Sequence, residues 1–453
     1  MSSSQSRITV LDQFQISPPP ESAPDAAALP LTFFDIVWLP TGPVERLFFY
    51  HFPHPTSHFV SHHLPVLKSS LSRTLRHFYP LAGRVTPPRG PSADARFEIR
   101  YSADDSVPLT LAESADDFEQ LSGDQPRGFG SVYSLIPLLP PTDDGSIPLL
   151  ALQITVFPNQ GVALGVAVHH VACDDSSSTH FVKSWAAACM LGDSTESPIS
   201  PLPPLCDPTA IADPDGLYHK ILAEMQALRP PPADLPPAGA EQGDAVIASF
   251  TIGREQIDRL KQGAAARSAA GHVSSFVVAC AFAWACLVRA QAAFYSTKKS
   301  AHLLFSVECR GRLEPPVPAG YFGNCLRPCF VEVEMNDLVK EDGVFAAAEA
   351  IGRAIKELGD GILKGAEGWL QKIISLMPER PMSIAGSPRY GVYEVDFGWG
   401  RPRRVEMTSI EKTPGTISLA ESREGGGIEM GLVLPKSEMD AFIFCFGNGL
   451  ELL

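Results

Sequence analysis

A proline-rich segment near the middle of the chain constrains the fold more than any other feature. It runs from Ser197 to Asp244 and includes "SPISPLPPLCDPTAIADPDG" and "LRPPPADLPPAGAEQGD". Proline breaks both helices and sheets, so we predict an extended crossover here, with "LYHKILAEMQAL" as a short helix inside it. Cutting the chain at this point leaves two parts of roughly 200 residues, an ordinary domain size. We therefore predict a domain over 1–196, a linker over 197–245 and a domain over 246–453.

Both halves mix predicted strands and helices. "LLALQITVF" and "VALGVAVHH" are two β-type runs that flank the turn composition "PNQG", which predicts a hairpin. "TISLAES" and "GIEMGLVL" flank the glycine-rich "REGGG" in the same way. Helical spacing runs through "HFVSHHLPVLKSSLSRTLRHF" and "FAAAEAIGRAIKELGDGILKG". This alternation favours an α/β or α+β architecture.

Composition and charge exclude several classes of function. The formal net charge of −15 argues against generic binding to nucleic acid or to anionic membranes. The longest apolar run, "FVVACAFAWACLV", is too short to span a bilayer and predicts a buried helix. No signal peptide is visible in "MSSSQSR", and the nine cysteines are an odd number, so we expect reduced thiols in the cytoplasm. Cys325 and Cys329 lack a second pair at zinc spacing and are interpreted as packing residues.

The stretch "VALGVAVHHVACDDSSSTHF" carries the densest polar cluster. His169 and His170 end a predicted strand, and Asp174, Asp175 and Ser176 compete to cap the helix that follows. A metal site would need a third ligand, which no spacing supplies. A serine hydrolase would need G-x-S-x-G, which the chain lacks, and Cys173 stands in an apolar context. The remaining chemical reading is a histidine general base, although an isolated cluster of this kind is more often a core histidine beside a helix cap.

Residues far apart in the chain resolve this choice through a resemblance. "HHVACD" fits H-x-x-x-D from His170 to Asp174, and "DFGWG" follows at Asp396 to Gly400. Together with "LPLTFFDIVWL", "FYPLAGRV" and "VECRGRLEPPVPAGYFGNC", in that order along almost the whole chain, these blocks resemble the plant BAHD acyl-CoA-dependent acyltransferases. "YFGNC" and "TISLAESREGGGIEMGL" resemble the branch that acylates anthocyanin, flavonoid and other phenolic glucosides. One position departs from the family pattern, because Asp175 stands where glycine is usual.

The resemblance implies a fold and a reaction. The fold would be two similar mixed-sheet domains of the chloramphenicol acetyltransferase-like type, with a solvent channel between them. His170 would deprotonate a sugar hydroxyl, which would attack the thioester of an acyl-CoA directly, without an acyl-enzyme. Malonyl-CoA is the favoured donor, with hydroxycinnamoyl donors such as coumaroyl-CoA as the alternative. The co-substrate would be the only cofactor, with no metal, and we expect a monomer.

The resemblance also assigns supporting residues. Asp174 would pair with Arg310 or Arg312 and brace the histidine turn, rather than relay a proton. The DFGWG segment, with Asp396, Gly398, Trp399 and Gly400, would form a structural loop near the CoA entrance. The phosphates of CoA require basic side chains or helix N-termini, and the candidates are Arg254, Arg401, Arg403 and Arg404. Arg401 could instead hold an acidic acceptor.

Two alternatives to this enzyme remain open from the sequence. A non-catalytic binding protein could keep the same fold, since fold does not by itself give function. Retention of both His170 and Asp174 argues against it. A metal-dependent hydrolase is the second alternative, and stoichiometric zinc in the purified protein would favour it.

Overall fold

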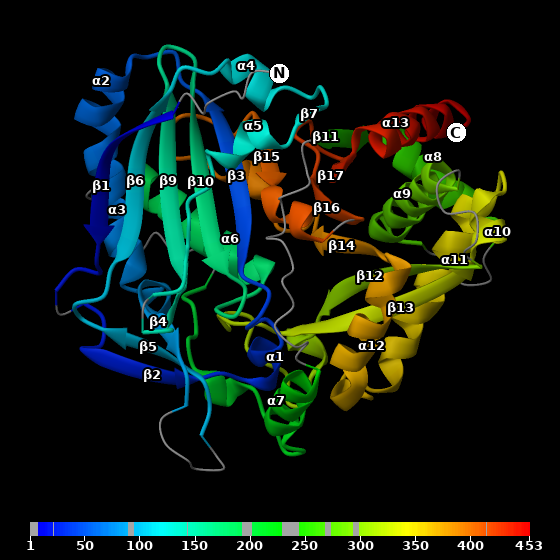
Figure 1. Ribbon diagram of the computed structural model, residues 1–453, viewed down its shortest axis with the longest axis horizontal. Helices are drawn as coiled ribbons and strands as arrows, with labels where there is room; N and C mark the ends of the chain where they lie inside the picture. Colours follow the sequence, from blue (N-terminus) through cyan, green and yellow to red (C-terminus); the bar gives the residue numbers. More distant parts are fainter. Residues whose placement is uncertain are drawn as a thin grey trace.

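The computed structural model describes residues 8–20, 22–88, 95–142, 144–192, 202–228, 244–267, 273–292, 299–413 and 415–453. Two lobes lie side by side, each built around a twisted sheet (Figure 1). Helices α3 (Leu64–Leu75) and α6 (Asp175–Leu191) pack together on one side of the first sheet. Helices α8 (Arg254–Ala265), α9 (Ser275–Gln291), α11 (Gly343–Glu357) and α13 (Lys436–Glu451) cover the second sheet, with α9 central among them.

The first sheet has six strands in a mixed order. From edge to edge they are β1 (Ile8–Ile16), β6 (Val107–Ser114), β9 (Leu150–Phe157), β10 (Gly161–His169), β3 (Pro43–His51) and β15 (Arg404–Met407). Every residue of β9 and β10 is buried, as expected for central strands covered on both faces. A separate four-stranded sheet contains β2 (Ala26–Pro30), β5 (Glu98–Ser102), β4 (Arg84–Thr86) and β8 (Ile147–Pro148).

The second sheet has seven strands. Their order is β13 (Leu326–Glu334), β12 (Ser300–Glu308), β14 (Met382–Gly386), β16 (Thr416–Glu421), β17 (Ile428–Pro435), β11 (Ala245–Ile252) and β7 (Arg127–Gly128). Its core is dominated by α9, in which all residues from Val277 to Val288 are buried. The apolar run of the sequence is therefore a core helix, as predicted. None of the helices in the described part of the chain is long and apolar enough to cross a membrane.

The two lobes exchange strands. β15 comes from the second half of the chain and pairs antiparallel with β3 of the first sheet. β7 comes from the first half and pairs with β11 of the second sheet. The exchanged strands are joined by a buried ion pair, in which Arg127 of β7 lies 2.6 Å from Glu406 of β15. The linear division of the sequence at 197–245 does not anticipate this exchange, because it depends on pairing between distant residues.

Local predictions agree with the structure where short-range patterns decide. β9 and β10 form the predicted hairpin, and α7 (Leu217–Ala227) forms within the proline-rich segment. Residues 197–201 and 229–243 of that segment lie outside the described residues. β16 and β17 pair across the glycine-rich turn as predicted.

Of two helix predictions, one needs correction. The helix expected over 345–365 ends at Glu357, and the glycines that follow, Gly361 and Gly365, adopt positive φ that a continuous helix does not use. The helical spacing over 58–78 is confirmed, because helix runs without a break through α2 (Thr56–His58), a π-helical turn over Phe59–His63, and α3.

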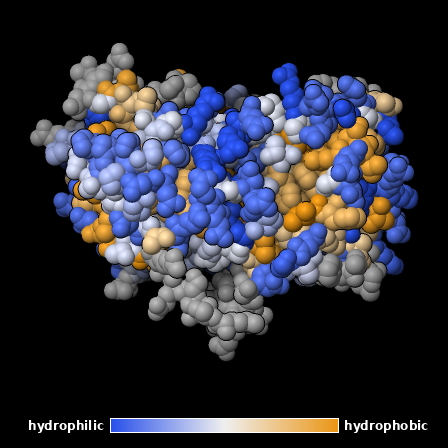
Figure 2. All heavy atoms as spheres, turned by 90° about the horizontal axis from the view of Figure 1, so that it is seen from above, coloured by the Kyte–Doolittle hydropathy of each residue, from blue (hydrophilic) through white to orange (hydrophobic). Residues whose placement is uncertain are grey.

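The remaining helices are short or peripheral. They are α1 (Phe33–Ile36), α4 (Phe118–Ser122), α5 (Gly130–Tyr133), α10 (Met335–Val339) and α12 (Trp369–Leu376). Seen from above, the surface is largely hydrophilic along the middle of the molecule, with an apolar area over the second lobe (Figure 2).

Candidate active site

The histidine turn connects the end of β10 to the start of α6. His169 is the last residue of β10, and His170 follows it. Of the three competing caps, Asp174 is the N-cap, because its carboxylate accepts a hydrogen bond from the Ser177 backbone N–H at 3.0 Å. Strand and helix therefore fix both ends of the turn.

The imidazole of His170 lies flat against an indole ring. The ring centroids of Trp38 and His170 are 3.7 Å apart and the two planes differ by 5°. Nδ1 of His170 is buried and makes no hydrogen bond to another described residue. The Trp38 stack is thus the contact that sets the ring plane, a role that a hydrogen-bonded carboxylate fulfils in many catalytic histidines. Burial lowers the pKa of His170, so the ring is neutral near pH 7 and able to accept a proton.

Asn324 joins this turn to α1. Its side-chain amide donates to the His170 carbonyl at 2.9 Å and to the Asp35 carboxylate at 3.0 Å. Asp35 in turn accepts hydrogen bonds from the backbone and hydroxyl of Thr32, closing a capping box at the start of α1. Because Trp38 lies two residues after the end of α1, this network fixes the position of the indole relative to His170.

Asp174 faces away from the ring and is fully enclosed. Its Oδ2 lies 2.8 Å from Arg310 and accepts a hydrogen bond from the Cys325 backbone N–H at 3.2 Å. Arg310 also donates to the carbonyls of Tyr321 and Gly323. Of the two partners offered by the sequence, the structure therefore places Arg310 against Asp174.

Other predicted residues near the turn lie as follows. The side chain of Arg312 is exposed and makes no ion pair in the described part of the chain. Cys173 is buried, and burial raises the pKa of its thiol well above the ordinary value, with the neighbouring Asp174 and Asp175 carboxylates adding to the shift. A thiol held neutral in this way is a packing group and a poor nucleophile. Burial also lowers the pKa of His169 to about 4.

The DFGWG segment is a tight loop packed on the first lobe. The Asp396 carboxylate accepts hydrogen bonds from the backbone N–H groups of Gly398 and Gly400 at 2.7 and 3.0 Å. Both glycines have positive φ, which a side chain would strain. The Trp399 indole N–H donates to Nδ1 of His63 at 3.1 Å, and its ring meets the edge of Tyr50. In this arrangement Asp396 organises the loop through its own backbone.

The arginines predicted to contact CoA fall into two groups. Arg254 is exposed at the first position of α8, and its stem lies against Gly426 in the glycine-rich β16–β17 turn. Arg423, in the same turn, donates to the Arg403 carbonyl at 2.9 Å. Arg254, Arg403 and Arg423 therefore gather around one turn, although Arg403 also pairs with Glu119. Sequence reasoning missed Arg423, which its place in "REGGG" could have indicated.

Arg401 and Arg404 lie elsewhere. Arg401 is exposed immediately after the DFGWG loop. Arg404 is 1% exposed and ion-paired with Glu406 and Asp124, each at 2.6 Å. A guanidinium enclosed by carboxylates cannot meet a phosphate at the surface, so Arg404 is removed from the CoA candidates.

Comparisons with known proteins decide which family this site belongs to. The sequence profile of the Transferase family matches residues 6–444. A malonyl-coenzyme A:anthocyanin 3-O-glucoside-6''-O-malonyltransferase from Dahlia pinnata is 36% identical over 457 residues, which cover 98% of each chain. The chain belongs to the BAHD acyltransferase family. The resemblance stated from the motifs is thereby confirmed, and the protein is an acyltransferase.

Further relatives of the acyltransferase differ in the donor that their names state. Phenolic glucoside malonyltransferase 2 from Arabidopsis thaliana is 37% identical, over 98% of this chain and 99% of its own. Coumaroyl-CoA:anthocyanidin 3-O-glucoside-6''-O-coumaroyltransferase 1 from the same plant is 36% identical, over 98% and 97% of the two chains. Among solved structures, vinorine synthase matches with a TM-score of 0.68 at 22% identity over 96% of each chain, which confirms the two-domain fold.

The described residues contain no group of three histidine, cysteine or carboxylate side chains placed to hold a metal ion. Trp38, Asp35 and Asn324, which lie around the His170 turn, are further residues to which sequence reasoning assigned no role. All three stand in quoted family blocks, "LPLTFFDIVWL" and "YFGNC", so the signal was present. What was lacking was the information that these blocks meet at His170.

Proposed function

We propose that the acyltransferase moves an acyl group from an acyl-CoA to a sugar hydroxyl of a phenolic or flavonoid glucoside, with malonyl-CoA as the favoured donor. The observation that carries the proposal is the half-buried, neutral His170 stacked against Trp38 at the end of a central strand. Relatives named as malonyltransferases of anthocyanin and phenolic glucosides support the donor and the acceptor class. A coumaroyl donor is the second candidate, because a relative of similar identity is named for it.

The chemical step needs one group that both takes and returns a proton. Because Nδ1 of His170 is buried, Nε2 is the atom proposed to accept the proton of the sugar hydroxyl. The oxygen then attacks the thioester carbonyl, and the tetrahedral intermediate collapses as the carbon–sulfur bond breaks. The departing thiolate of CoA takes the proton from Nε2, which restores the neutral imidazole. General-base catalysis of this kind contributes roughly 10² to 10⁴-fold.

Positioning supplies the rest of the rate in this proposal. Asp174 and Arg310 brace the turn that carries His170, and their enclosure supports a structural role rather than proton transfer. Asp396, Gly398, Trp399 and Gly400 shape the DFGWG loop. The braced turn holds the histidine within reach of both substrates.

CoA is proposed to place its phosphates near the glycine-rich β16–β17 turn. Arg254, Arg403 and Arg423 lie around that turn, and α8 begins at Arg254, where backbone N–H groups favour anions. Arg401 remains a further candidate on the basis of its exposure.

We also propose that the protein is a cytoplasmic monomer. Its nine cysteines are unpaired, as reduced thiols would be.

A thiol-release assay tests the function. The purified protein is given malonyl-CoA or coumaroyl-CoA with a panel of flavonoid and phenolic glucosides. CoA release that requires both substrates, with malonyl-CoA the better donor, is the expected result. CoA release with coumaroyl-CoA alone would show that the protein uses aromatic acyl donors. Absence of CoA release with every donor would contradict the proposal.

A further inference from the structure

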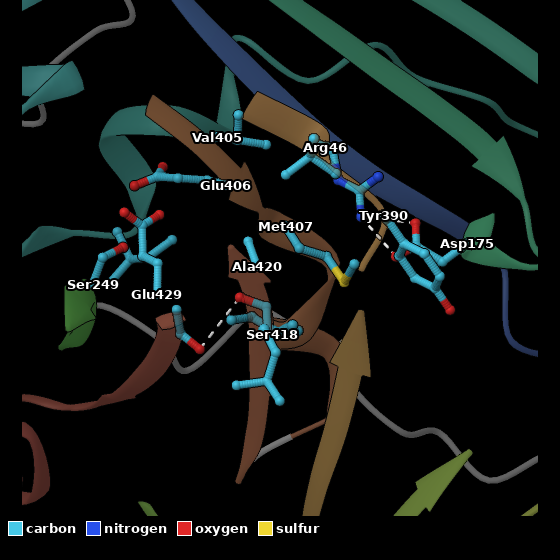
Figure 3. Close-up of a pocket in the computed structure, with 15 residues that line it drawn as sticks. Arg46, Asp175, Ser249, Tyr390, Val405, Glu406, Met407, Ser418, Ala420 and Glu429 are labelled. Carbon is cyan, nitrogen blue, oxygen red and sulfur yellow. Dashed lines mark hydrogen bonds and ion pairs between the residues drawn. The ribbon is translucent and has the colours of Figure 1, made fainter. Parts of the chain in front are cut away.

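An ion pair beside the histidine turn faces a pocket between the two lobes. Arg46 of β3 lies 2.7 and 2.9 Å from the two carboxylate oxygens of Asp175, the first residue of α6 (Figure 3). Tyr390 lies beside this pair, and the far side of the pocket carries Glu406 and Glu429. The pocket thus joins residues of the first lobe to β15, β16 and β17.

The pocket begins at the helix start that follows the histidine turn. Asp175 directly follows Asp174, the cap that braces the turn, and lies five residues after His170. The Asp175 carboxylate opposes the lowering of the His170 pKa that burial causes, so its charge is felt at the imidazole. An acyl group held near His170 would therefore experience the charge at this end of the pocket.

The pocket offers no cation free of a carboxylate. Of the described residues that line it, Arg46 is the only one with a positive charge. Its guanidinium is occupied by Asp175 and by the Thr179 hydroxyl at 3.2 Å, and its side chain is 10% exposed. Among the other charged groups, Glu406 is paired with Arg127, and Glu429 accepts a hydrogen bond from the Tyr393 hydroxyl.

We propose that Asp175 is a specificity-determining residue that neutralises Arg46 and so withholds from an anionic acyl group the cation that would favour it. The consequence is that this chain uses malonyl-CoA and acetyl-CoA, which differ by one carboxylate, with similar efficiency. The inference rests on the proposed transfer from acyl-CoA and does not depend on which donor is natural.

A purely structural tie between β3 and α6 is the competing explanation. Breaking such a tie would change stability and would change activity with all donors alike. A specificity role changes the ratio of kcat/KM for malonyl-CoA to that for acetyl-CoA, because only the malonyl group carries a charge that Arg46 can meet.

The experiment measures that ratio in wild type, in four variants of the Arg46–Asp175 pair and in one control variant. We expect Asp175→Asn and Asp175→Gly to raise the ratio by about tenfold, as one released charged hydrogen bond allows. Arg46→Gln should lower it by a similar factor, because Asp175 is then an unpaired anion. In the double variant Arg46→Gln with Asp175→Asn the gain should vanish. The matched control is Glu394→Gln, which breaks the Lys183–Glu394 pair on the same helix α6 outside the pocket and should leave the ratio unchanged.

Two results would overturn the inference. One is an unchanged ratio in both folded Asp175 variants. The other needs no variant: wild-type dissociation constants for malonyl-CoA and acetyl-CoA should agree within about threefold, since the ion pair presents no net charge, and a far tighter malonyl complex would contradict this. A much tighter malonyl-CoA complex would leave the proposed function intact. Failure of the wild-type protein to use any acyl-CoA would instead contradict the proposed function.

Discussion

At the scale of single residues, the site depends on the stacking of the His170 imidazole against the Trp38 indole. His170 has no hydrogen-bonding partner at Nδ1 among the described residues, and the Trp38 indole lies parallel to it at 3.7 Å. Burial is the main cause of the lowered His170 pKa, and the indole supplies part of that burial. The Trp38 side chain therefore affects both the orientation of the His170 ring and its pKa.

Replacing Trp38 should separate these effects. Trp38→Leu removes the flat surface and admits water, so kcat should fall by about tenfold or more and the acidic limb of the kcat–pH profile should move to higher pH, because the His170 pKa rises towards its ordinary value. Trp38→Phe keeps a flat ring and should recover most of the rate. Equal pH profiles in wild type and Trp38→Leu would contradict this account.

Asp174 is expected to act through structure. Asp174→Asn leaves buried Arg310 with only the more exposed Glu308 as a counter-charge, and breaking a buried pair in this way costs about 3–5 kcal/mol of the free energy of unfolding. Activity and melting temperature should therefore fall together, as calorimetry and the thiol-release assay would show. The exposed neighbour offers the control, since Arg312→Gln should change neither. Lost activity at an unchanged melting temperature would instead indicate a direct chemical role for Asp174.

At the scale of elements, the DFGWG loop is attached to the first lobe through a histidine. Nδ1 of His63 accepts the Trp399 N–H, so this nitrogen must be unprotonated for the contact to exist. Burial lowers the pKa of His63, with His58, His62 and His54 adding to the shift. Because the folded state holds this ring neutral, the unfolded chain binds the proton more readily, and stability falls as the pH drops below about 6.5.

The pH dependence of His63→Phe checks this assignment. The variant leaves the Trp399 N–H without an acceptor and should be less stable at pH 7.5, by about 1–3 kcal/mol. It also lacks the titrating group, so its melting temperature should fall less than that of wild type between pH 7.5 and pH 5.5. Identical falls in the two proteins would show that His63 contributes nothing to the acid sensitivity.

Elements were also the scale at which the sequence was most informative. The hairpin of β9 and β10 and the Asp174 cap follow from patterns within a few residues, and both are present. The H-x-x-x-D motif pointed to His170 because the resemblance to the family gives the motif histidine the role of the base. The stack on Trp38 and the Arg46–Asp175 pair join segments that are distant in the chain. No local sequence pattern indicates which arginine contacts Asp175 or which aromatic ring packs on His170.

At the scale of the whole molecule, the exchanged strands make the two lobes one unit. Glu406 of β15 is paired with both Arg127 of β7 and Arg404, and all three side chains are at most 5% exposed. The cluster lies where each half of the chain contributes a strand to the sheet of the other. A site between the lobes, such as the Arg46–Asp175 pocket, is thereby kept in a fixed geometry.

Glu406→Gln should destabilise both lobes at once. It leaves two buried guanidinium groups short of a carboxylate, which we expect to cost about 3–5 kcal/mol and to lower the melting temperature in a single calorimetric transition. Breaking the exposed Lys436–Asp440 pair with Asp440→Asn is the matched control and should have little effect. Two separate transitions in wild type would contradict the view that the lobes unfold as one unit.

The central claim is that His170 is the base of a direct acyl transfer, and His170→Ala tests it most directly. The measurement is the steady-state rate of CoA release with a donor and glucoside that wild type uses, with circular dichroism and melting temperature confirming the fold of the variant. The account predicts a folded protein whose kcat is lower by about 10² or more. A folded His170→Ala protein that turns over at nearly the wild-type rate would contradict it.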